Sequence, residues 1–385
     1  MSKTEMPSIR FYGFDNDWEQ RKLGELVDVC SGRDYKHLSE GTIPVYGTGG
    51  YMLSVNDALS YDRDAIGIGR KGTIDRPYIL KAPFWTVDTL FYAIPREKVD
   101  LNYAFDIFQN IDWKKKDEST GVPSLSKTAI NDIDVLAPKH DEQQIIGQFF
   151  AAIDNLITLH QRKFEKLTNV KKSMLEKMFP QNGSCYPAVR FKGFTDPLEQ
   201  RKAIDIADYS KGNGYSKGDL TDAGTPIILY GRLYTKYQFA ISEVDTFAVP
   251  RNGAVYSQGN EVIVPASGET AEDIARASAV EKSGVLLGGD LNILRPFDFI
   301  NPLFLALAIS NGEPQKELAK KAQGKSVVHI HNTDIQEVTI AYPSRTEQDR
   351  IVSVFCQLDH LITLHQRELE KLQSIKKALL EKMFV

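Results

Sequence analysis

The chain has 385 residues, which is too long for one compact hydrophobic core, so we expect two or three domains. Apolar residues make up 42% and charged residues 25%, as in ordinary globular proteins, and this composition excludes wholesale disorder. The net charge of −4 argues against a chain that binds polyanions over its whole surface. Any contact with nucleic acid must therefore come from local clusters of Lys and Arg.

The sequence has no run of 18 or more apolar residues, and its first residues, MSKTEMP, lack the apolar core of a signal peptide. We therefore predict a cytoplasmic protein with no membrane contact. The three cysteines, Cys30, Cys185 and Cys356, lie far apart in the sequence. This spacing excludes a disulfide framework and a CxxC metal site, and we predict that the chain binds no metal.

The chain contains an internal duplication. Residues 7–22, PSIRFYGFDNDWEQRK, recur at 187–202 as PAVRFKGFTDPLEQRK, at an offset of 180. Residues 142–179 recur at 347–384, at an offset of 205, with 22 of 38 aligned positions identical. The longest identical stretches there are LITLHQR and LEKMF. Because the stretches between these segments differ, the pattern indicates shared connectors that carry two divergent bodies.

The first body, about residues 20–140, is predicted to mix short strands and helices. Apolar runs bounded by turn residues predict strands at residues 65–69 and 90–94. A helix is predicted at residues 101–111.

Residues 142–179 are predicted to form one long helix, with Asp141 as its N-cap. Apolar or near-apolar residues recur in alternating steps of four and three, which is the pattern of a coiled-coil seam. At 1.5 Å per residue the helix would be about 55 Å long. Its seam consists of Ile146, Phe150, Ile153, Ile157, His160, Phe164, Leu167, Lys171, Met174 and Met178.

The second body, about residues 199–345, resembles the first in its mixture of short elements. We expect strands at residues 226–230, 261–265 and 292–295, and helices at residues 302–310 and 314–322. Both bodies close with a similar apolar pattern that ends at a proline, Pro138 or Pro343. This similarity predicts one fold with two different sets of loops.

The second copy of the long segment predicts a second helix, with Thr346 as its N-cap. Because the two seams match, we expect each helix to pair with the other in the same chain. Connectivity favours an antiparallel pair, in which the end of the second helix lies near the first shared motif at Pro7. The seam of the second helix consists of Ile351, Phe355, Leu358, Ile362, His365, Leu369, Leu372, Lys376, Leu379 and Met383.

The predicted fold class is therefore α+β and pseudo-two-fold, with two similar mixed bodies and an intramolecular antiparallel coiled coil. The expected boundaries are residues 1–140 and 181–345 for the bodies, and 141–180 and 346–385 for the helices. The histidines and lysines at the seam are interpreted as polar residues that fix the register of the pair. Contact with a partner, or a catalytic histidine, is the alternative interpretation.

Several short motifs resemble catalytic sites but lack the context that the chemistry needs. Residues 67–72 match G-x-G-x-x-G, yet no helix is predicted to start there, as a dinucleotide site requires. Residues 319–326 resemble a P-loop, but a helix precedes them instead of following. Residues 301–304 match an amino-methyltransferase element only in part, and His329 and His331 have no third metal ligand nearby. We therefore predict no catalytic site and no cofactor in this chain.

The paired RFxGF…EQRK motifs, the two Glu-Gln helix starts, LITLHQR and LEKMF resemble the specificity subunit of type I restriction-modification systems. The resemblance covers essentially the whole chain. It implies two target-recognition domains, each of which reads one half of a bipartite, asymmetric DNA site. It also implies that the helical rod sets the spacing between half-sites and binds two modification subunits, which restriction subunits join. S-adenosylmethionine, ATP and Mg²⁺ are then expected on the partner subunits, and the chain itself is not an enzyme.

Residues that read bases cannot be assigned from the shared motifs, because the bodies vary within the family. We choose instead loop residues whose side chains can pair with base edges or phosphates. The candidates in the first body are Thr48, Arg70, Lys71 and Thr73, with Lys114, Lys115 and Lys116 expected on phosphates. The candidates in the second body are Arg232, Tyr234, Thr235, Lys236, Ser267, Glu269 and Thr270.

Three alternatives remain open from the sequence. The chain could be a duplicated coiled-coil adaptor that binds two proteins and no DNA, the specificity subunit of a related type IIB-like system, or an enzyme that uses the glycine-rich stretches.

Overall fold

The computed structural model describes residues 7–181, 183–322, 324 and 327–384. The chain divides into two compact units. The first unit comprises Met1–Arg162 and His365–Val385, and the second comprises Lys163–Leu364. The two long helices, α4 (His140–Met178) and α10 (Arg345–Met383), each contribute one part to each unit.

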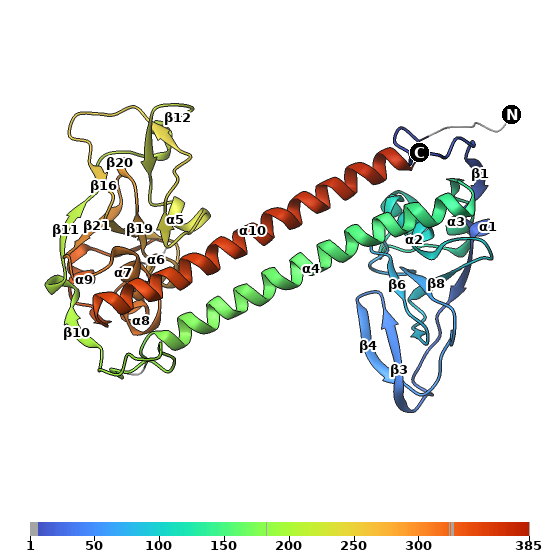
Figure 1. Ribbon diagram of the computed structural model, residues 1–385, viewed down its shortest axis with the longest axis horizontal. Coiled ribbons are helices and arrows are strands. Elements are labelled where there is room, and N and C mark those ends of the chain that lie inside the picture. Colours follow the sequence, from blue (N-terminus) through green and yellow to red (C-terminus); the bar gives the residue numbers. More distant parts are fainter. Residues whose placement is uncertain (1–6, 182, 323, 325–326, 385) are drawn as a thin grey trace. The chain divides into compact units, whose positions relative to one another are not determined.

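The body of the first unit contains two small sheets and short helices (Figure 1). Its four-stranded sheet has the antiparallel order β2-β8-β5-β6, and its three-stranded sheet has the order β4-β3-β7, in which β3 and β7 run parallel. Its elements are β1 (Glu19–Lys22), α1 (Leu23–Leu26), β2 (Val27–Ser31), β3 (Glu40–Gly47), β4 (Gly50–Val55), β5 (Ala65–Gly69), β6 (Tyr78–Leu80), β7 (Trp85–Thr86), β8 (Leu90–Pro95), α2 (Leu101–Asn110), η1 (Trp113–Lys116), α3 (Lys127–Asn131) and β9 (Asp134–Ala137).

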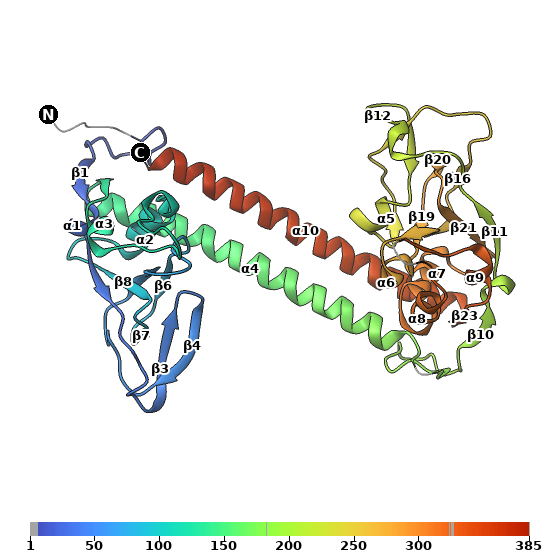
Figure 2. The ribbon, with the colours of Figure 1, turned by 180° about the vertical axis from the view of Figure 1, so that it is seen from behind.

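The body of the second unit has two five-stranded sheets, with the orders β11-β21-β17-β19-β14 and β12-β15-β13-β20-β16 (Figure 2). Helix α7 packs on the first of them. The elements are β10 (Glu199–Lys202), η2 (Ala203–Asp205), β11 (Ala207–Lys211), η3 (Lys217–Asp219), β12 (Leu220–Thr221), β13 (Thr225–Ile228), α5 (Arg232–Thr235), β14 (Ala240–Ile241), β15 (Phe247–Ala248), β16 (Tyr256–Gln258), β17 (Glu261–Pro265), β18 (Ser267–Gly268), α6 (Ala271–Ile274), β19 (Ser278–Val280), β20 (Ser283–Leu287), β21 (Leu291–Pro296), α7 (Pro302–Ile309), α8 (Gly312–Lys321), β22 (Val328–His329), α9 (Asn332–Gln336) and β23 (Thr339–Tyr342).

The two bodies share one strand topology, as the sequence predicted. The order β2-β8-β5-β6 corresponds to β11-β21-β17-β19, with antiparallel neighbours in both sheets. The order β4-β3-β7 corresponds to β15-β13-β20, and the last two strands of each set run parallel. The second body adds strands β12, β14 and β16 to this common plan. A shared framework therefore carries different additions in the two units.

The predicted strands and helices of both bodies are confirmed, with ends that agree to within two residues. The predicted N-caps of the long helices are wrong, because Asp141 and Thr346 lie inside the first turn. The helices begin directly after Lys139 and Ser344, whose carbonyls accept the first intrahelical hydrogen bonds. Each preceding strand ends at the residue before a proline, and each helix begins two residues after that proline.

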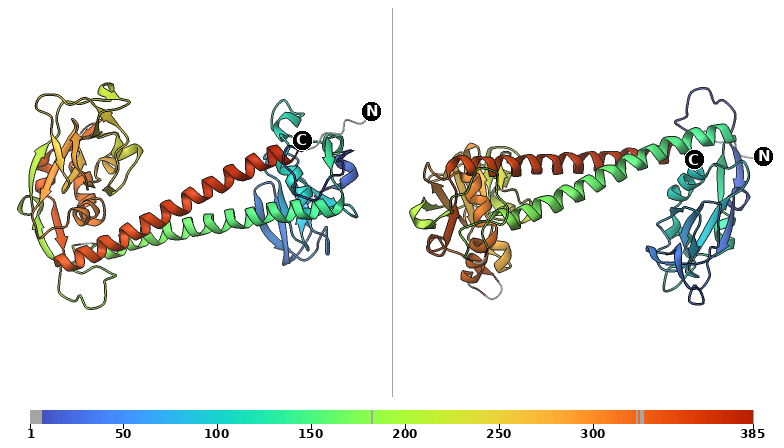
Figure 3. Two further views of the ribbon diagram at one scale, coloured as in Figure 1. Left: turned by 45° about the horizontal axis from the view of Figure 1, so that its top comes forward. Right: turned by 60° about the horizontal axis from the view of Figure 1, so that its bottom comes forward.

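Antiparallel pairing of the long helices is visible inside each unit (Figure 3). In the first unit, Asp154 of α4 contacts Lys376 of α10, and His160 of α4 contacts His365 of α10. Residue numbers therefore increase along α4 in the direction in which they decrease along α10, as in an antiparallel pair. The end of α10 also reaches the first shared motif, because the Ile9 N–H donates to the Lys382 carbonyl at 3.2 Å. The prediction of an intramolecular antiparallel pair is confirmed.

Every predicted seam residue is buried or half-buried. Two of the polar seam residues, Lys171 and Lys376, form equivalent ion pairs. The two lysines, and their two partners, are each separated by the 205 positions that relate the two copies of the long segment. Lys376 Nζ lies 2.5 Å from Asp154 Oδ1 in the first unit, and Lys171 Nζ lies 2.5 Å from Asp359 Oδ1 in the second. These matched contacts support the interpretation that polar seam residues fix the register.

The shared motifs hold each body to the start of a long helix through a buried ion pair. Arg10 makes two hydrogen bonds, of 2.7 and 2.8 Å, to the carboxylate of Glu142, and Arg190 makes two, of 2.8 and 2.7 Å, to Glu347. Both carboxylates are 2% exposed. The hydrogen bonds that the arginines donate to these carboxylates raise the pKa of both guanidinium groups, so the pairs remain charged.

The glutamine that follows each of these glutamates joins the same helix to the body. The Gln143 side chain donates to the Pro138 carbonyl and accepts from the Asp100 N–H, which belongs to the N-cap of α2. Gln348 makes the equivalent contacts with Pro343 and with Asn301, the N-cap of α7. The repeated Glu-Gln pair therefore fixes the start of each long helix to two segments of its own body.

Within the described part of the chain, no helix is both long enough and apolar enough to cross a membrane. Apolar residues line the seam of both long helices, and their other faces mix charged residues with a few exposed apolar ones, such as Leu156 and Leu361.

We expect the buried ion pair to dominate local stability in the second unit. Glu347→Ala leaves Arg190 buried without its partner and should lower the free energy of unfolding by about 3–5 kcal/mol. Glu199→Ala is the matched control, because it removes an exposed partner of Arg201 and should cost less than about 1 kcal/mol. Urea unfolding of both variants measures the difference, and equal small losses would contradict this prediction.

A buried carboxyl in the first unit should make stability depend on pH. Asp106 is 1% exposed, its Oδ2 has no hydrogen-bond partner among the described residues, and nearby Lys376 is bound to Asp154 and Gln109. Burial raises the pKa of Asp106 well above its usual range. Its proton therefore stabilises the fold below the unfolded pKa of about 3.9, and this contribution is lost as the pH rises toward the folded pKa.

Asp106→Asn removes this dependence while keeping the shape of the side chain. The melting temperature of the variant should exceed that of the wild type by an increasing margin as the pH is raised from about 4 toward the raised pKa. Parallel melting curves across this pH series check the margin, and a margin that shrinks with pH would refute the prediction.

Candidate nucleic-acid interface

Three of the predicted DNA contacts lie on the turn that follows β5. Arg70, Lys71 and Thr73 are exposed there, and the Arg70 and Lys71 N–H groups both donate to the carbonyl of Thr89. The Arg70 guanidinium lies 5.7 Å from the centroid of the Phe91 ring. The backbone of the turn is thus fixed while its polar side chains face solvent, as a reading loop requires.

The three lysines of η1 lie next to this turn, but two of them are already paired. Lys114 Nζ lies 2.9 Å from Asp75, which follows the turn, and Lys115 Nζ lies 3.1 Å from Asp112. Lys116 is exposed and forms no ion pair with any of the described residues. The structure therefore brings the turn and η1 together, with less free positive charge than the sequence suggested.

Thr48 lies elsewhere, at the tip of the β3–β4 hairpin in the second sheet (Figure 1). The Tyr78 hydroxyl donates to the Gly47 carbonyl at 2.6 Å and holds the hairpin against β6. Tyr51 and Met52 on β4 are 63% and 49% exposed. Sequence reasoning missed these two residues, because an apolar residue in a strand pattern is ordinarily assigned to the core.

In the second unit, Arg232 forms part of an internal network. Its side chain is 9% exposed and forms an ion pair with Asp245, which also binds Lys236 at 2.6 Å. The Lys236 and Arg232 hydrogen bonds hold the pKa of Asp245 well below its usual range. Arg232 also donates to the Glu243 carbonyl at 2.8 Å. The arrangement fixes α5 in place, and a base contact by Arg232 stays a prediction.

Other candidates of the second unit meet where α5 faces β18. The Tyr234 hydroxyl donates to the Ser267 carbonyl at 2.6 Å, and the Ser267 hydroxyl lies 3.2 Å from Nδ1 of His329. Burial raises the pKa of Tyr234, so its hydroxyl stays protonated and able to donate. Glu269 is exposed beside them, and Thr270 is the N-cap of α6.

A cavity of about 870 Å³ gathers the loops around α5. Of the predicted contacts, Arg232, Thr235 and Lys236 line it. Lys217, Tyr230 and Asp290 line the same cavity and were missed by sequence analysis. The Gly288-Gly289-Asp290 turn was the available signal for Asp290, since such turns place residues in unusual backbone conformations.

The short motifs that resemble nucleotide-binding sites are not followed directly by the helix that such sites require. After Gly67–Gly72 the chain continues through a turn and strands, and the next helix, α2, starts only at Leu101. Helix α8 precedes the P-loop-like stretch, of which residues 323, 325 and 326 lie outside the described residues. His329 lies on β22 and His331 is the N-cap of α9.

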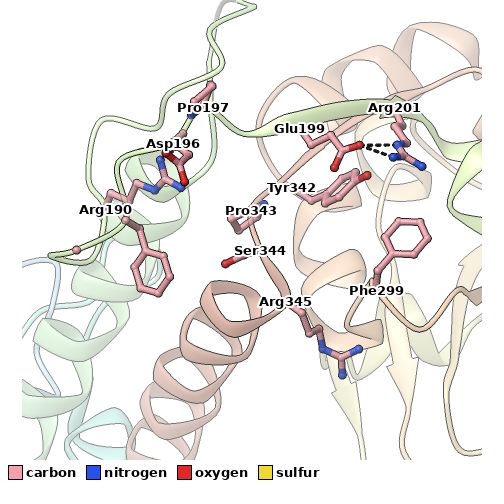
Figure 4. A pocket seen from close by; sticks show the side chains of 12 residues that line it. Arg190, Asp196, Pro197, Glu199, Arg201, Phe299, Tyr342, Pro343, Ser344 and Arg345 are labelled. Atoms are coloured by element: carbon pink, nitrogen blue, oxygen red, sulfur yellow. Dashed lines mark hydrogen bonds and ion pairs between the residues drawn. The ribbon is translucent and has the colours of Figure 1, made fainter.

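A second cavity, of about 550 Å³, lies between the shared motif of the second unit and the start of α10 (Figure 4). Arg190, Arg201 and Arg345 line it together with Phe299 and Tyr342. Each arginine is already paired, with Glu347, Glu199 and Asp349 respectively. Burial, with a smaller effect from Glu199, raises the pKa of Tyr342 to about 12. The cavity is therefore close to electrically balanced and is unsuited to phosphate.

The arrangement of two like bodies on shared connectors agrees with comparisons to known proteins. A family model described as the type I restriction modification DNA specificity domain matches residues 15–169 and, again, residues 196–374. The chain belongs to this family. The two matches fall on the two halves of the duplication, which the shared topology defines independently.

Two relatives agree with this assignment. The specificity subunit of the type I restriction enzyme MjaVIII from Methanocaldococcus jannaschii is 20% identical over 278 residues, which cover 69% of this chain and 65% of that protein. The chain thus spans slightly less than two thirds of that relative's length. The crystal structure of a type I restriction-modification S subunit from M. genitalium has a TM-score of 0.70 at 14% identity and covers 99% of both chains. It has the same fold.

The contact between α5 and β18 is testable by removing one oxygen. Tyr234→Phe deprives the part-buried Ser267 carbonyl of its donor and should lower the free energy of unfolding by about 1 kcal/mol. Tyr230→Phe is the control, since Tyr230 is 38% exposed and its hydroxyl has no recorded hydrogen bond among the described residues. Urea unfolding distinguishes the two, and indistinguishable curves would show that the bond contributes nothing.

Proposed function

We propose that this chain is the DNA sequence-specificity subunit of a type I restriction-modification complex. Each body, residues 1–140 and residues 181–345, reads one half of a bipartite, asymmetric DNA site. The observation that carries the proposal is the shared strand topology of two bodies whose loops differ. A common framework with different loops is what two readers of two different half-sites require.

The long helices α4 and α10, predicted at residues 141–180 and 346–385, set the spacing between the half-sites in this proposal. Each is continuous over 39 residues and contributes to both units. A continuous helix of this length extends about 58 Å and cannot shorten without breaking hydrogen bonds. Half-sites on one face of the duplex are separated by about 34 Å for each turn of the DNA. Helices of fixed length between the two bodies would therefore select one number of base pairs between the half-sites.

The same helices offer two copies of one docking surface for modification subunits. Leu156 and Leu361 are 46% and 39% exposed, and Leu159 and Leu364 are 46% and 43% exposed. Each pair is separated by the duplicated offset of 205, and one member of each lies in each unit. Exposed apolar residues repeated in both copies favour two copies of one protein partner.

The chain contributes recognition, and its partners contribute the chemistry. Two modification subunits would bring S-adenosylmethionine and methylate adenine, and restriction subunits would bring ATP and Mg²⁺. With a net charge of −4, this chain needs partners that enclose the duplex and supply most of the phosphate contacts. Weak DNA binding by the isolated chain follows, and we expect the complex to act in the cytoplasm.

Methylome sequencing tests the proposal directly. The chain is co-expressed with its modification subunits, and adenine methylation is mapped with and without its gene. We expect one split motif to depend on the gene. If no split motif depends on it, the proposal is wrong, and a protein adaptor without DNA recognition becomes the better account.

Variants within one body should then change one half of that motif. Lys71→Ala combined with Thr73→Ala should relax the first half-site, and Glu269→Ala should relax the second, with about 1–3 kcal/mol less discrimination per lost base contact. Each variant is the control for the other. Loss of methylation at both half-sites would indicate failed folding or assembly and not a change in reading.

A further inference from the structure

The turn that follows β5 in the first unit has a counterpart that follows β17 in the second unit. The two strands enter their turns in the same register, because the last residue of each, Gly69 or Pro265, pairs with the first residue of β8 or β21. The two strands are thus related by an offset of 196. Lys71 and Ser267, which lie two residues after these strand ends, are therefore equivalent.

The segment that closes each body pairs with this turn in the same way. Lys71 forms an antiparallel bridge with Ser124, and Ser267 of β18 pairs antiparallel with His329 of β22. Ser124 and His329 are separated by 205 positions, which is the offset of the long repeated segments that follow them. Two independent offsets therefore meet at one place in each unit. We call the pairs Lys71–Ser124 and Ser267–His329 the paired turns.

The two paired turns exchange a long and a short side chain. In the first unit the exposed Lys71 lies on the turn, and the smaller Ser124 lies opposite it. In the second unit the turn carries Ser267, which is 8% exposed, and the exposed His329 lies opposite it. A polar side chain with reach is kept at this place while its chemistry changes. Two readers of different half-sites require such a difference on a common framework.

Ser267 orients the imidazole ring of His329. The Ser267 hydroxyl lies 3.2 Å from Nδ1 of His329, and it forms no other hydrogen bond with the described residues. Its hydrogen is therefore available to Nδ1, which leaves the hydrogen of the neutral ring on Nε2. The Tyr234 hydroxyl donates to the Ser267 carbonyl at 2.6 Å and so fixes the backbone that supports the ring. Within the described chain Nε2 has no partner, and it can donate to an acceptor from outside.

The charges beside the paired turn of the second unit disfavour a phosphate contact. Glu269 is exposed two residues after Ser267, and Glu272 is exposed on α6, which packs against both β18 and β22. Carboxylates repel phosphate groups but can accept a hydrogen bond from the amino group of cytosine. A ring donor among carboxylates therefore fits the edges of bases better than the DNA backbone.

We infer that His329 is a specificity-determining residue of the second unit, and that its Nε2 donates to an acceptor on the edge of one base. Guanine and adenine offer N7 in the major groove, guanine also offers O6, and thymine offers O4, whereas cytosine offers only its amino group. The contact therefore disfavours cytosine at one position of the second half-site. Ser267, predicted as a base contact itself, instead positions the ring. This inference rests on the proposed function and names one of its base contacts.

The test uses the purified complex of this chain with its modification subunits, and duplexes that contain its own split motif. In both half-sites, each base that is not already cytosine is replaced in turn by cytosine, with guanine opposite, and the dissociation constant is measured. The factor by which a replacement weakens binding is the penalty at that position. His329→Ala should lower the penalty by about tenfold at one position of the second half-site and leave every penalty of the first half-site unchanged.

Further variants separate a lost base contact from a damaged fold. His329→Phe keeps a ring without a donor, so it should lower the same penalty as His329→Ala. Ser267→Ala releases Nδ1 and should lower that penalty by about threefold, at that position alone. Thr333→Ala is the control and should change no penalty, because Thr333 is an exposed residue of α9 outside the paired turn. Thermal melting shows whether each variant is folded.

The outcomes separate this inference from the proposed function. If both His329 variants weaken binding to every duplex equally, the residue contacts phosphate and the inference is overturned. The inference is also overturned if both variants leave all penalties unchanged, or if they lower penalties in both half-sites. Methylation of a split motif by the wild-type complex keeps the proposed function in each of these cases. If the wild-type complex methylates no split motif, the proposed function itself fails.

Discussion

Two buried ion pairs, Arg10–Glu142 and Arg190–Glu347, connect the shared motifs to the starts of the long helices. Each pair is bidentate, and each glutamate is followed by a glutamine that binds the N-cap of a helix in the body. A buried charge that loses its partner is strongly destabilising, so the orientation of each body against its helix depends on these contacts. The divergent loops can then vary without moving the framework that presents them.

The duplication lets the structural features that both units share be separated from those found in one unit alone. Strand order, the ion pairs at the helix starts and the lysine–aspartate pairs at the seam are repeated in both units. Helix α5 and the turn at Asp290, which has a positive φ, line the cavity of about 870 Å³ in the second unit. Conserved geometry and variable lining are what recognition of two unrelated half-sites needs, and membership of the specificity family agrees with this division.

Sequence analysis predicted the duplication, the long helices and the common topology, because these depend on repeated local patterns. The heptad spacing placed His160 and His365 on the seams, connectivity gave the antiparallel direction, and the structure shows the two residues in contact. Sequence analysis could not predict that Arg232 is nearly buried, that Lys114 is neutralised by Asp75, or that Asp290 faces a cavity. These properties depend on loops that meet only in the folded body, and a single sequence carries no periodic signal for such contacts. The N-caps were misplaced because each helix begins one residue before the residue that was predicted to cap it.

The contact between the two seam histidines has a consequence for the protons they carry. Nδ1 of His365 lies 3.2 Å from Nδ1 of His160, and the rings are 5.1 Å apart between centroids. A hydrogen bond between two such nitrogens needs one ring to donate and the other to accept. The donating ring must carry a hydrogen on Nδ1, and the accepting ring must leave its Nδ1 without one. The contact therefore links the tautomers of two equivalent residues that lie 205 positions apart in the sequence.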